Sequence, residues 1–141
     1  MENNDTFNQE VWGEKHGLLQ FPKASKRERN EGCEGLEKKT ASECCEDRKE
    51  GSAGLNNPRA GAGRTSGGQN HHPTVKPVHL MSWLVRLVSK EGDTVLDPFM
   101  GSGTTGVACK RLKRNYVGCE LEPDYIKIAE ARINAVIVPL L

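Results

Sequence analysis

The chain has no long apolar run, and its 141 residues have a mean hydropathy of −0.63. A membrane-spanning helix needs about 20 consecutive apolar residues, so we expect no membrane association. The polar N-terminus also lacks the apolar core of a secretory signal, which predicts a cytoplasmic protein. The net charge of +1 gives no bulk sign of nucleic-acid binding, and any such surface would have to be local.

The cysteines do not indicate a disulfide framework, because their number, five, is odd and no secretory signal accompanies them. Five side chains in this part of the chain are of types that can bind zinc: Cys33, Cys44, Cys45, His71 and His72. Their spacing contains no two-residue knuckle, so free thiols and no metal site are predicted. The remaining two, Cys109 and Cys119, lie in apolar patterns and are expected to be small core residues.

Apolar residues are unevenly distributed along the chain. Residues 1–69 contain 17 residues of the set AVILMFWYC, whereas residues 70–141 contain 33. We therefore predict a polar, largely irregular N-terminal segment, residues 1–69, with a flexible Gly-rich loop over 51–69. Residues 70–141 are predicted to form the folded unit, and the length allows one domain at most.

The most informative stretch joins a predicted strand, Thr94–Asp97, to a helix predicted from about Thr104 to Lys113. Glycines between them allow close backbone approach to a ligand, and the first N–H groups of a helix favour an anion. Gly101, Gly103 and Gly106 satisfy the dinucleotide fingerprint, with Glu120 at the expected distance. A P-loop is excluded because no Gly-Lys-Ser/Thr follows, whereas a nicotinamide enzyme stays a distant alternative.

Three sequence patterns together resemble one family. Asp97–Thr105 resembles motif I of the amino-group DNA methyltransferases, 72–77 (His-Pro-Thr-Val-Lys-Pro) resembles their motif X, and 118–125 resembles motif II. This family transfers a methyl group from S-adenosylmethionine to adenine N6 or cytosine N4. The resemblance covers roughly residues 21–35 and 70–134, and it implies the C-terminal, cofactor-binding portion of such an enzyme.

The predicted fold class is α/β, a partial Rossmann-like methyltransferase fold. A helix is expected over 78–89, with an apolar core face formed by Leu80, Trp83, Leu84, Leu87 and Val88. The strand Thr94–Asp97, the helix after it and a second strand, Tyr116–Glu120, make a parallel βαβ unit. A second helix begins at Pro123; its expected buried stripe consists of Tyr125, Ile128, Ala129, Ile133 and Val136.

The resemblance implies a set of cofactor-binding residues, which are Thr74, Lys76, Asp97, Phe99, Gly101, Gly103, Thr104, Thr105 and Glu120. Glu120 would accept hydrogen bonds from both ribose hydroxyls, and the threonines would meet the methionine carboxylate. Lys76 is equally well explained as a solvent-facing lysine. Asp97 has an alternative role as a helix cap, and Phe99 as a core residue.

The catalytic Pro-Pro-aromatic motif of the family is absent, because no two of the seven prolines are adjacent. We therefore assign no catalytic residue to this chain. The expected partner is double-stranded DNA, and a separately encoded catalytic half would be a second partner in a split enzyme. A split methyltransferase, an inactive remnant and an accessory module that binds DNA or cofactor are all alternatives to an active enzyme.

Basic residues in two regions raise the question of DNA contact. Lys23, Lys26, Arg27 and Arg29 could touch phosphates or belong to a solvated charged turn. A second cluster, comprising Lys110, Arg111, Lys113 and Arg114, is better explained by the helix C-terminus it accompanies. For Arg59 and Arg64, an inert surface loop is the preferred interpretation.

Overall fold

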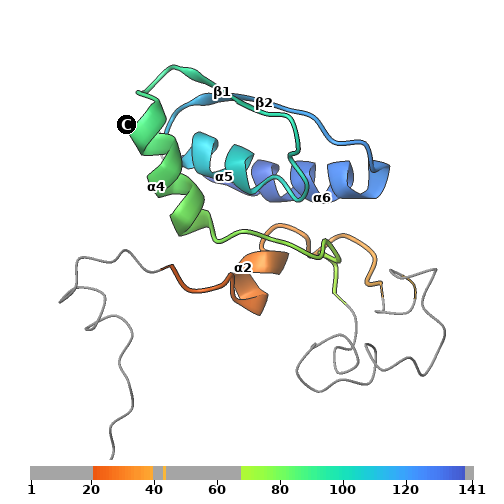
Figure 1. Cartoon of the computed structure of the whole chain (residues 1–141). Coiled ribbons are helices and arrows are strands. Elements are labelled where there is room, and N and C mark those ends of the chain that lie inside the picture. Colours follow the sequence, from red (N-terminus) through yellow and green to blue (C-terminus); the bar gives the residue numbers. More distant parts are fainter. Residues whose placement is uncertain (1–20, 40–42, 44–67, 139–141) are drawn as a thin grey trace, which may run out of the picture.

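The computed structural model describes residues 21–39, 43 and 68–138. Figure 1 shows the arrangement of its elements. In chain order they are α2 (Lys26–Asn30), α4 (Val78–Val88), β1 (Thr94–Asp97), α5 (Thr104–Arg111), β2 (Asn115–Gly118) and α6 (Pro123–Asn134).

The two strands form a parallel sheet, with Thr94 opposite Asn115 and Asp97 opposite Gly118. Helix α5 connects them, so the predicted α/β class and βαβ unit are confirmed. The boundaries differ slightly from those expected. Helix α5 ends at Arg111 because Lys113 adopts a left-handed backbone, with φ of 57°, and β2 starts one residue earlier than predicted.

The core lies around α5, whose first six residues are all buried. Side chains from α4 and α6 pack on it in two clusters. One comprises Val78, Val107, Ala129 and Ile133, and the other comprises Val85, Ala108 and Cys109. In α6, Ile128, Ala129 and Ile133 are buried as predicted, because these residues recur at helical spacing on one face.

The predicted core face of α4 is wrong. The structure buries Val78 and Val85, which lie on the side of the helix facing α5. Four residues of the expected stripe are exposed instead: Trp83, Leu84, Leu87 and Val88. Helix α4 carries apolar residues on most of its circumference, so periodicity alone could not show which side meets a partner.

One face of the sheet is also open in the described part of the chain. Leu96 and Val117 are cross-strand neighbours on this face, and they are 63% and 51% exposed. Figure 1 shows α5 and α6 together on the other side of the strands. Cys119 is exposed beyond the end of β2, so its predicted core position is wrong, whereas that of Cys109 is confirmed.

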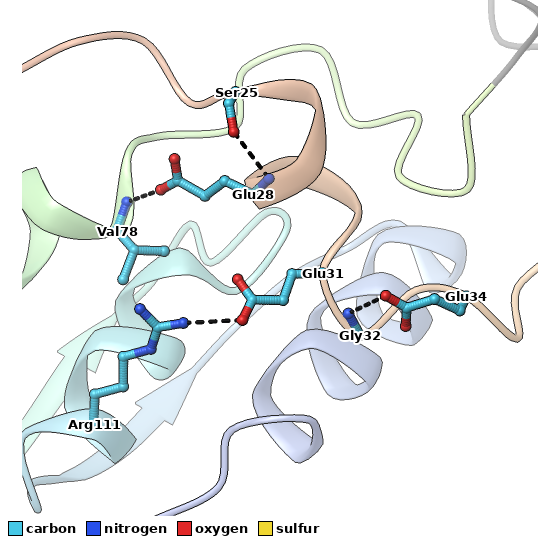
Figure 2. A network of polar contacts seen from close by, with 7 residues as sticks. All are labelled: Ser25, Glu28, Glu31, Gly32, Glu34, Val78 and Arg111. Carbon is cyan, nitrogen blue, oxygen red and sulfur yellow. Dashed lines mark hydrogen bonds and ion pairs between the residues drawn. The ribbon is translucent and has the colours of Figure 1, made fainter.

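The described part of the N-terminal segment packs onto the α/β unit. The Glu28 carboxylate accepts a hydrogen bond of 2.6 Å from the backbone N–H of Val78, the first residue of α4, and Glu31 pairs with Arg111 at 3.3 Å (Figure 2). The N-terminus of a helix leaves N–H groups without helical partners. A residue 50 positions earlier in the chain therefore caps α4.

Two further side chains attach this segment to the residues before α4. Arg29 donates to the carbonyl oxygen of His72 at 3.0 Å, and the Asn30 side-chain oxygen accepts from the backbone N–H of Asn70 at 3.0 Å. Arg29 therefore has a structural role, while Lys23, Lys26 and Arg27 are exposed. Whether those three contact DNA stays a prediction, and Arg59 and Arg64 lie outside the described residues.

The basic cluster near the end of α5 interacts with the protein itself. Lys110 donates a hydrogen bond to the carbonyl oxygen of Ile133 at 2.9 Å. Arg114 donates to the carbonyl oxygen of Ser89 at 3.0 Å. Lys113 forms an ion pair with Glu91 at 3.6 Å. These contacts favour the structural interpretation of the cluster. Within the described ranges, no helix has the length and apolar character needed to cross a bilayer.

Candidate cofactor site

The loop between β1 and α5 has a backbone that only glycine adopts easily. Gly101 and Gly103 have φ of 54° and 73°, in the left-handed region that disfavours other residues. Space is also limiting, because a Cβ added at Gly103 would lie 2.8 Å from the Cβ of Ala129. The glycines thus let the loop turn tightly while α6 packs directly against it.

Asp97, at the end of β1, holds the loop from one side. One carboxylate oxygen accepts from the backbone N–H of Phe99 at 3.1 Å, and the other accepts from the Thr105 hydroxyl at 2.5 Å. The carboxylate thereby ties the end of the strand to the first turn of α5. Asp97 therefore fixes the glycine turn, and the proton of the Thr105 hydroxyl is used in the bond to its carboxylate.

Glu120, just beyond β2, holds the loop from a second side. Its carboxylate accepts hydrogen bonds from the backbone N–H groups of Gly101, Leu121 and Glu122, at 2.9, 2.9 and 3.0 Å. These bonds, led by the one from Glu122, lower the pKa of Glu120. The group is therefore a firmly held anion, and Oε2, which accepts a single bond, keeps acceptor capacity for a ligand.

Arg132 of α6 also contacts this loop, and the sequence did not predict the contact. Its side chain is 3% exposed. A single guanidinium nitrogen donates to the Ser102 carbonyl at 2.6 Å, to the Ser102 hydroxyl at 3.1 Å and to the Thr104 hydroxyl at 3.0 Å. An arginine next to an apolar stripe is usually solvent-facing, so no signal in the sequence identified this contact.

A cavity of about 250 Å³ opens above the loop. Its lining joins the segment before α4 to the loop after β1, and includes Thr74, Lys76, Asp97, Phe99, Gly101, Thr104 and Thr105. Seven of the nine predicted cofactor residues therefore line one space. Gly103 and Glu120 do not line it, but Glu120 binds the Gly101 N–H at its edge. Small-molecule pockets typically measure about 300–1,000 Å³, so the cavity would hold part of a cofactor-sized ligand.

His72 also lines the cavity, and the prediction did not include it among the cofactor residues. Its Nδ1 accepts from the backbone N–H of Thr74 at 3.2 Å, so the neutral ring carries its proton on Nε2. Burial lowers the pKa of His72, the nearby Glu120 carboxylate opposing this effect. The sequence signal that could have identified His72 as a cavity residue is its position directly before the Pro-Thr-Val-Lys-Pro run.

The exposed members of the lining are less firmly held. The Lys76 ammonium group donates to the Thr74 carbonyl at 3.2 Å, and both residues are exposed. Phe99 is 89% exposed, which excludes core packing as its role. Among the residues that the structure describes, no group of three His, Cys, Asp or Glu side chains is arranged to hold a metal ion; Cys44 and Cys45 lie outside them.

The fold and the loop define an α/β protein with a cavity at the carboxyl ends of two parallel strands, where ligands bind in open sheets. A sequence model described as "DNA methylase" matches residues 1–131. The chain therefore belongs to the DNA methylase family. This finding confirms the resemblance of the three motifs and leaves the nicotinamide alternative without support.

Individual relatives match about half of the chain. Type II methyltransferase M2.DpnII of Streptococcus pneumoniae is 52% identical over 64 residues, which are 45% of this chain and 24% of the relative. Type II methyltransferase M2.LlaDCHI of Lactococcus lactis subsp. cremoris is 49% identical over 63 residues, 45% of this chain and 23% of the relative. The chain thus spans about a quarter of the length of these curated relatives.

Two solved structures are also similar to this chain. The crystal structure of M1.HpyAVI is 48% identical and aligns with a TM-score of 0.42, over 43% of this chain and 30% of that one. The crystal structure of the M1.HpyAVI-SAM complex has the same identity and TM-score, over 45% of this chain and 31% of that one.

Proposed function

We propose that this chain binds S-adenosylmethionine for a DNA methyltransferase that methylates adenine N6 or cytosine N4. The observation that carries the proposal is the shared cavity, in which Thr74 and Lys76 face the same space as Gly101 and Thr104. These residues come from two motifs that are about 25 positions apart. Membership of the DNA methylase family supports this ligand over other nucleotides.

The contacts in the site indicate which part of the cofactor each residue of the cavity would meet. Gly101 and Gly103 allow the backbone to approach the ligand, and Phe99, exposed at the cavity, lies against it. The first turn of α5, with Thr104 and Thr105, meets the methionine carboxylate, because helix N-termini favour anions. Asp97 holds this turn in place through Thr105.

Glu120 is proposed to bind the ribose hydroxyls. Its depressed pKa ensures that it is ionised near neutral pH, and an ionised acceptor makes the stronger hydrogen bond. Lys76 is proposed to reach the methionine carboxylate, since this residue lines the cavity. A carboxylate and an ammonium group would then contact different parts of the same ligand.

Methyl transfer itself is proposed to require a second component. A base must leave the DNA stack before its exocyclic amine can be methylated, and the family's Pro-Pro-aromatic motif for that amine is absent from the 141 residues. The exposed apolar residues Leu96 and Val117 on the sheet, and Leu87 and Val88 on α4, support a catalytic half as the partner that covers them. Double-stranded DNA would be bound by the assembled enzyme.

Isothermal titration of the full chain with S-adenosylmethionine tests this function. We expect uptake of one cofactor per chain, and binding roughly 10- to 100-fold weaker in Glu120→Gln, because a hydrogen bond to a charged group contributes about 1.5–3 kcal/mol. Glu122→Gln is the matched control, because the side chain of this exposed neighbour takes part in no proposed contact and its backbone N–H is unchanged. Failure of the folded wild-type chain to take up the cofactor would reject the proposal.

A further inference from the structure

Arg132 places a charged group in the interior, directly behind the proposed cofactor loop. Its guanidinium group donates three hydrogen bonds to Ser102 and Thr104, and both of these residues line the cavity. The buried cation therefore contacts two residues that border the space for the ligand.

The charge of Arg132 is not balanced by a close carboxylate. No ion pair found among the described residues includes it, and Glu28 and Glu31 influence it only at longer range. Burial lowers the pKa of this guanidinium, but arginine stays protonated in proteins. Because no carboxylate of the described residues lies beside it and the interior screens charges weakly, the field of this cation acts on the residues around the loop.

The direction of the hydrogen bonds determines what the loop can offer a ligand. The Thr104 hydroxyl oxygen accepts from Arg132, so its own proton is available for donation. The Ser102 hydroxyl is held in the same way. The Thr105 hydroxyl differs, because its proton already goes to Asp97. The hydroxyl protons that are not already donated therefore belong to Ser102 and Thr104, two residues that line the cavity next to the positive end of the α5 dipole.

We infer that Arg132 is a positioning residue that makes this site selective for a ligand carrying a carboxylate, through the oriented hydroxyls of Ser102 and Thr104 and its own buried charge. The inference rests on the proposed function and specifies how the amino-acid end of the cofactor is recognised. A purely structural Arg132 would support the loop equally for any ligand that binds there.

The test compares two ligands that differ only in this group. The full chain is titrated with S-adenosylhomocysteine and with its decarboxylated analogue, which keeps the adenosine and the ammonium group. In Arg132→Met, we expect S-adenosylhomocysteine to bind roughly tenfold more weakly, as for loss of a charge-assisted contact. The decarboxylated analogue should change by less than about twofold.

Two further variants complete the experiment. Arg132→Lys keeps the charge but not the planar donor geometry, so we expect an intermediate loss that is again confined to S-adenosylhomocysteine. Lys127→Met removes one positive charge from the exposed side of the same helix, where its side chain is 66% exposed. This control should leave the affinity for both ligands unchanged, because exposed charges are screened.

The outcomes separate the inference from the proposed function. An equal loss for both ligands, or no loss for either, in a folded Arg132 variant overturns the positioning role. If the wild-type chain binds neither ligand, the proposed function fails instead. Circular dichroism reports the folding of each variant, and if Arg132→Met is unfolded, Arg132→Lys supplies the same comparison of the two ligands.

Discussion

The two sides of the β1–β2 sheet differ sharply. On one side, α5 is enclosed so completely that every residue from Gly101 to Cys109 is buried. On the other side, Leu96 and Val117 are more than half exposed. Helices α5 and α6 cover the side of the sheet that carries the candidate cofactor loop. In the described part of the chain, the opposite side presents an apolar surface of the kind that normally marks an interaction site.

This difference explains how a short sheet can hold an ordered loop. The loop is not stabilised by the strands alone, since Asp97, Glu120 and Arg132 contact it from three elements or their ends. The N-terminal segment adds a cap to α4 and a contact to His72. Most of the described elements therefore contact the loop or the residues next to it. None of these contacts, within the described residues, involves the exposed side chains of Leu96 and Val117.

The largest expected difference in stability is between two variants that each remove an apolar side chain, one on either side of the sheet. Ile133, which is 4% exposed, packs against Val107 and Ala129, and Ile133→Ala should lower the free energy of unfolding by roughly 2–5 kcal/mol. Leu96→Ala on the open face should change it by less than about 0.5 kcal/mol. Urea unfolding of both variants measures the difference, and similar losses would show that the open face is covered in solution.

A smaller contrast is expected between two glycines that share a left-handed backbone. Gly103→Ala combines backbone strain of about 1–2 kcal/mol with a clash against Ala129, which adds about 1–3 kcal/mol. At Gly92, φ is 86° but nothing lies within 4 Å of an added Cβ, so Gly92→Ala should cost only the strain. Thermal unfolding of the pair tests this, and equal shifts would contradict the close packing of α6 on the loop.

The smallest expected effect is the pH dependence of the tie between Asp124 and Lys39. Hydrogen bonds from Lys39 and Lys127 lower the pKa of Asp124 from 3.8 to about 2. A depressed carboxyl pKa stabilises the fold above the unfolded-state value, and this contribution disappears as the pH falls through about 2. Between pH 4 and 2, the melting temperature of Asp124→Asn should therefore fall less than that of the wild type.

Glu130→Gln, an exposed carboxylate on the same helix, is the control for this measurement. Its melting curve should follow the wild type at every pH in the window. Parallel curves for the wild type and Asp124→Asn would mean that the N-terminal segment is not held to α6 through Lys39.

Most local structure was predictable because it follows from short-range patterns. The bounds of β1, the start of α5 and the start of α6 at Pro123 are where the sequence places them. Five of the seven predicted cofactor residues in the cavity lie between the end of β1 and the start of α5, where neighbours in the sequence must also be neighbours in space. The other two, Thr74 and Lys76, reach the cavity through tertiary packing. The assignment of all nine to cofactor binding stays a prediction, as does the division of the chain at residue 69.

What the sequence by itself determined is the family, the βαβ unit and the glycine loop, because each is encoded in residues that are close together in the chain. The tertiary structure decided which side of α4 is buried, how residues 21–39 cap that helix, and that Arg132 supports the loop. Those contacts join residues between 23 positions apart (Val85 and Ala108) and 50 positions apart (Glu28 and Val78). Whether a polar or apolar side chain is buried depends on which element packs against it. Local spacing carries no information about that partner.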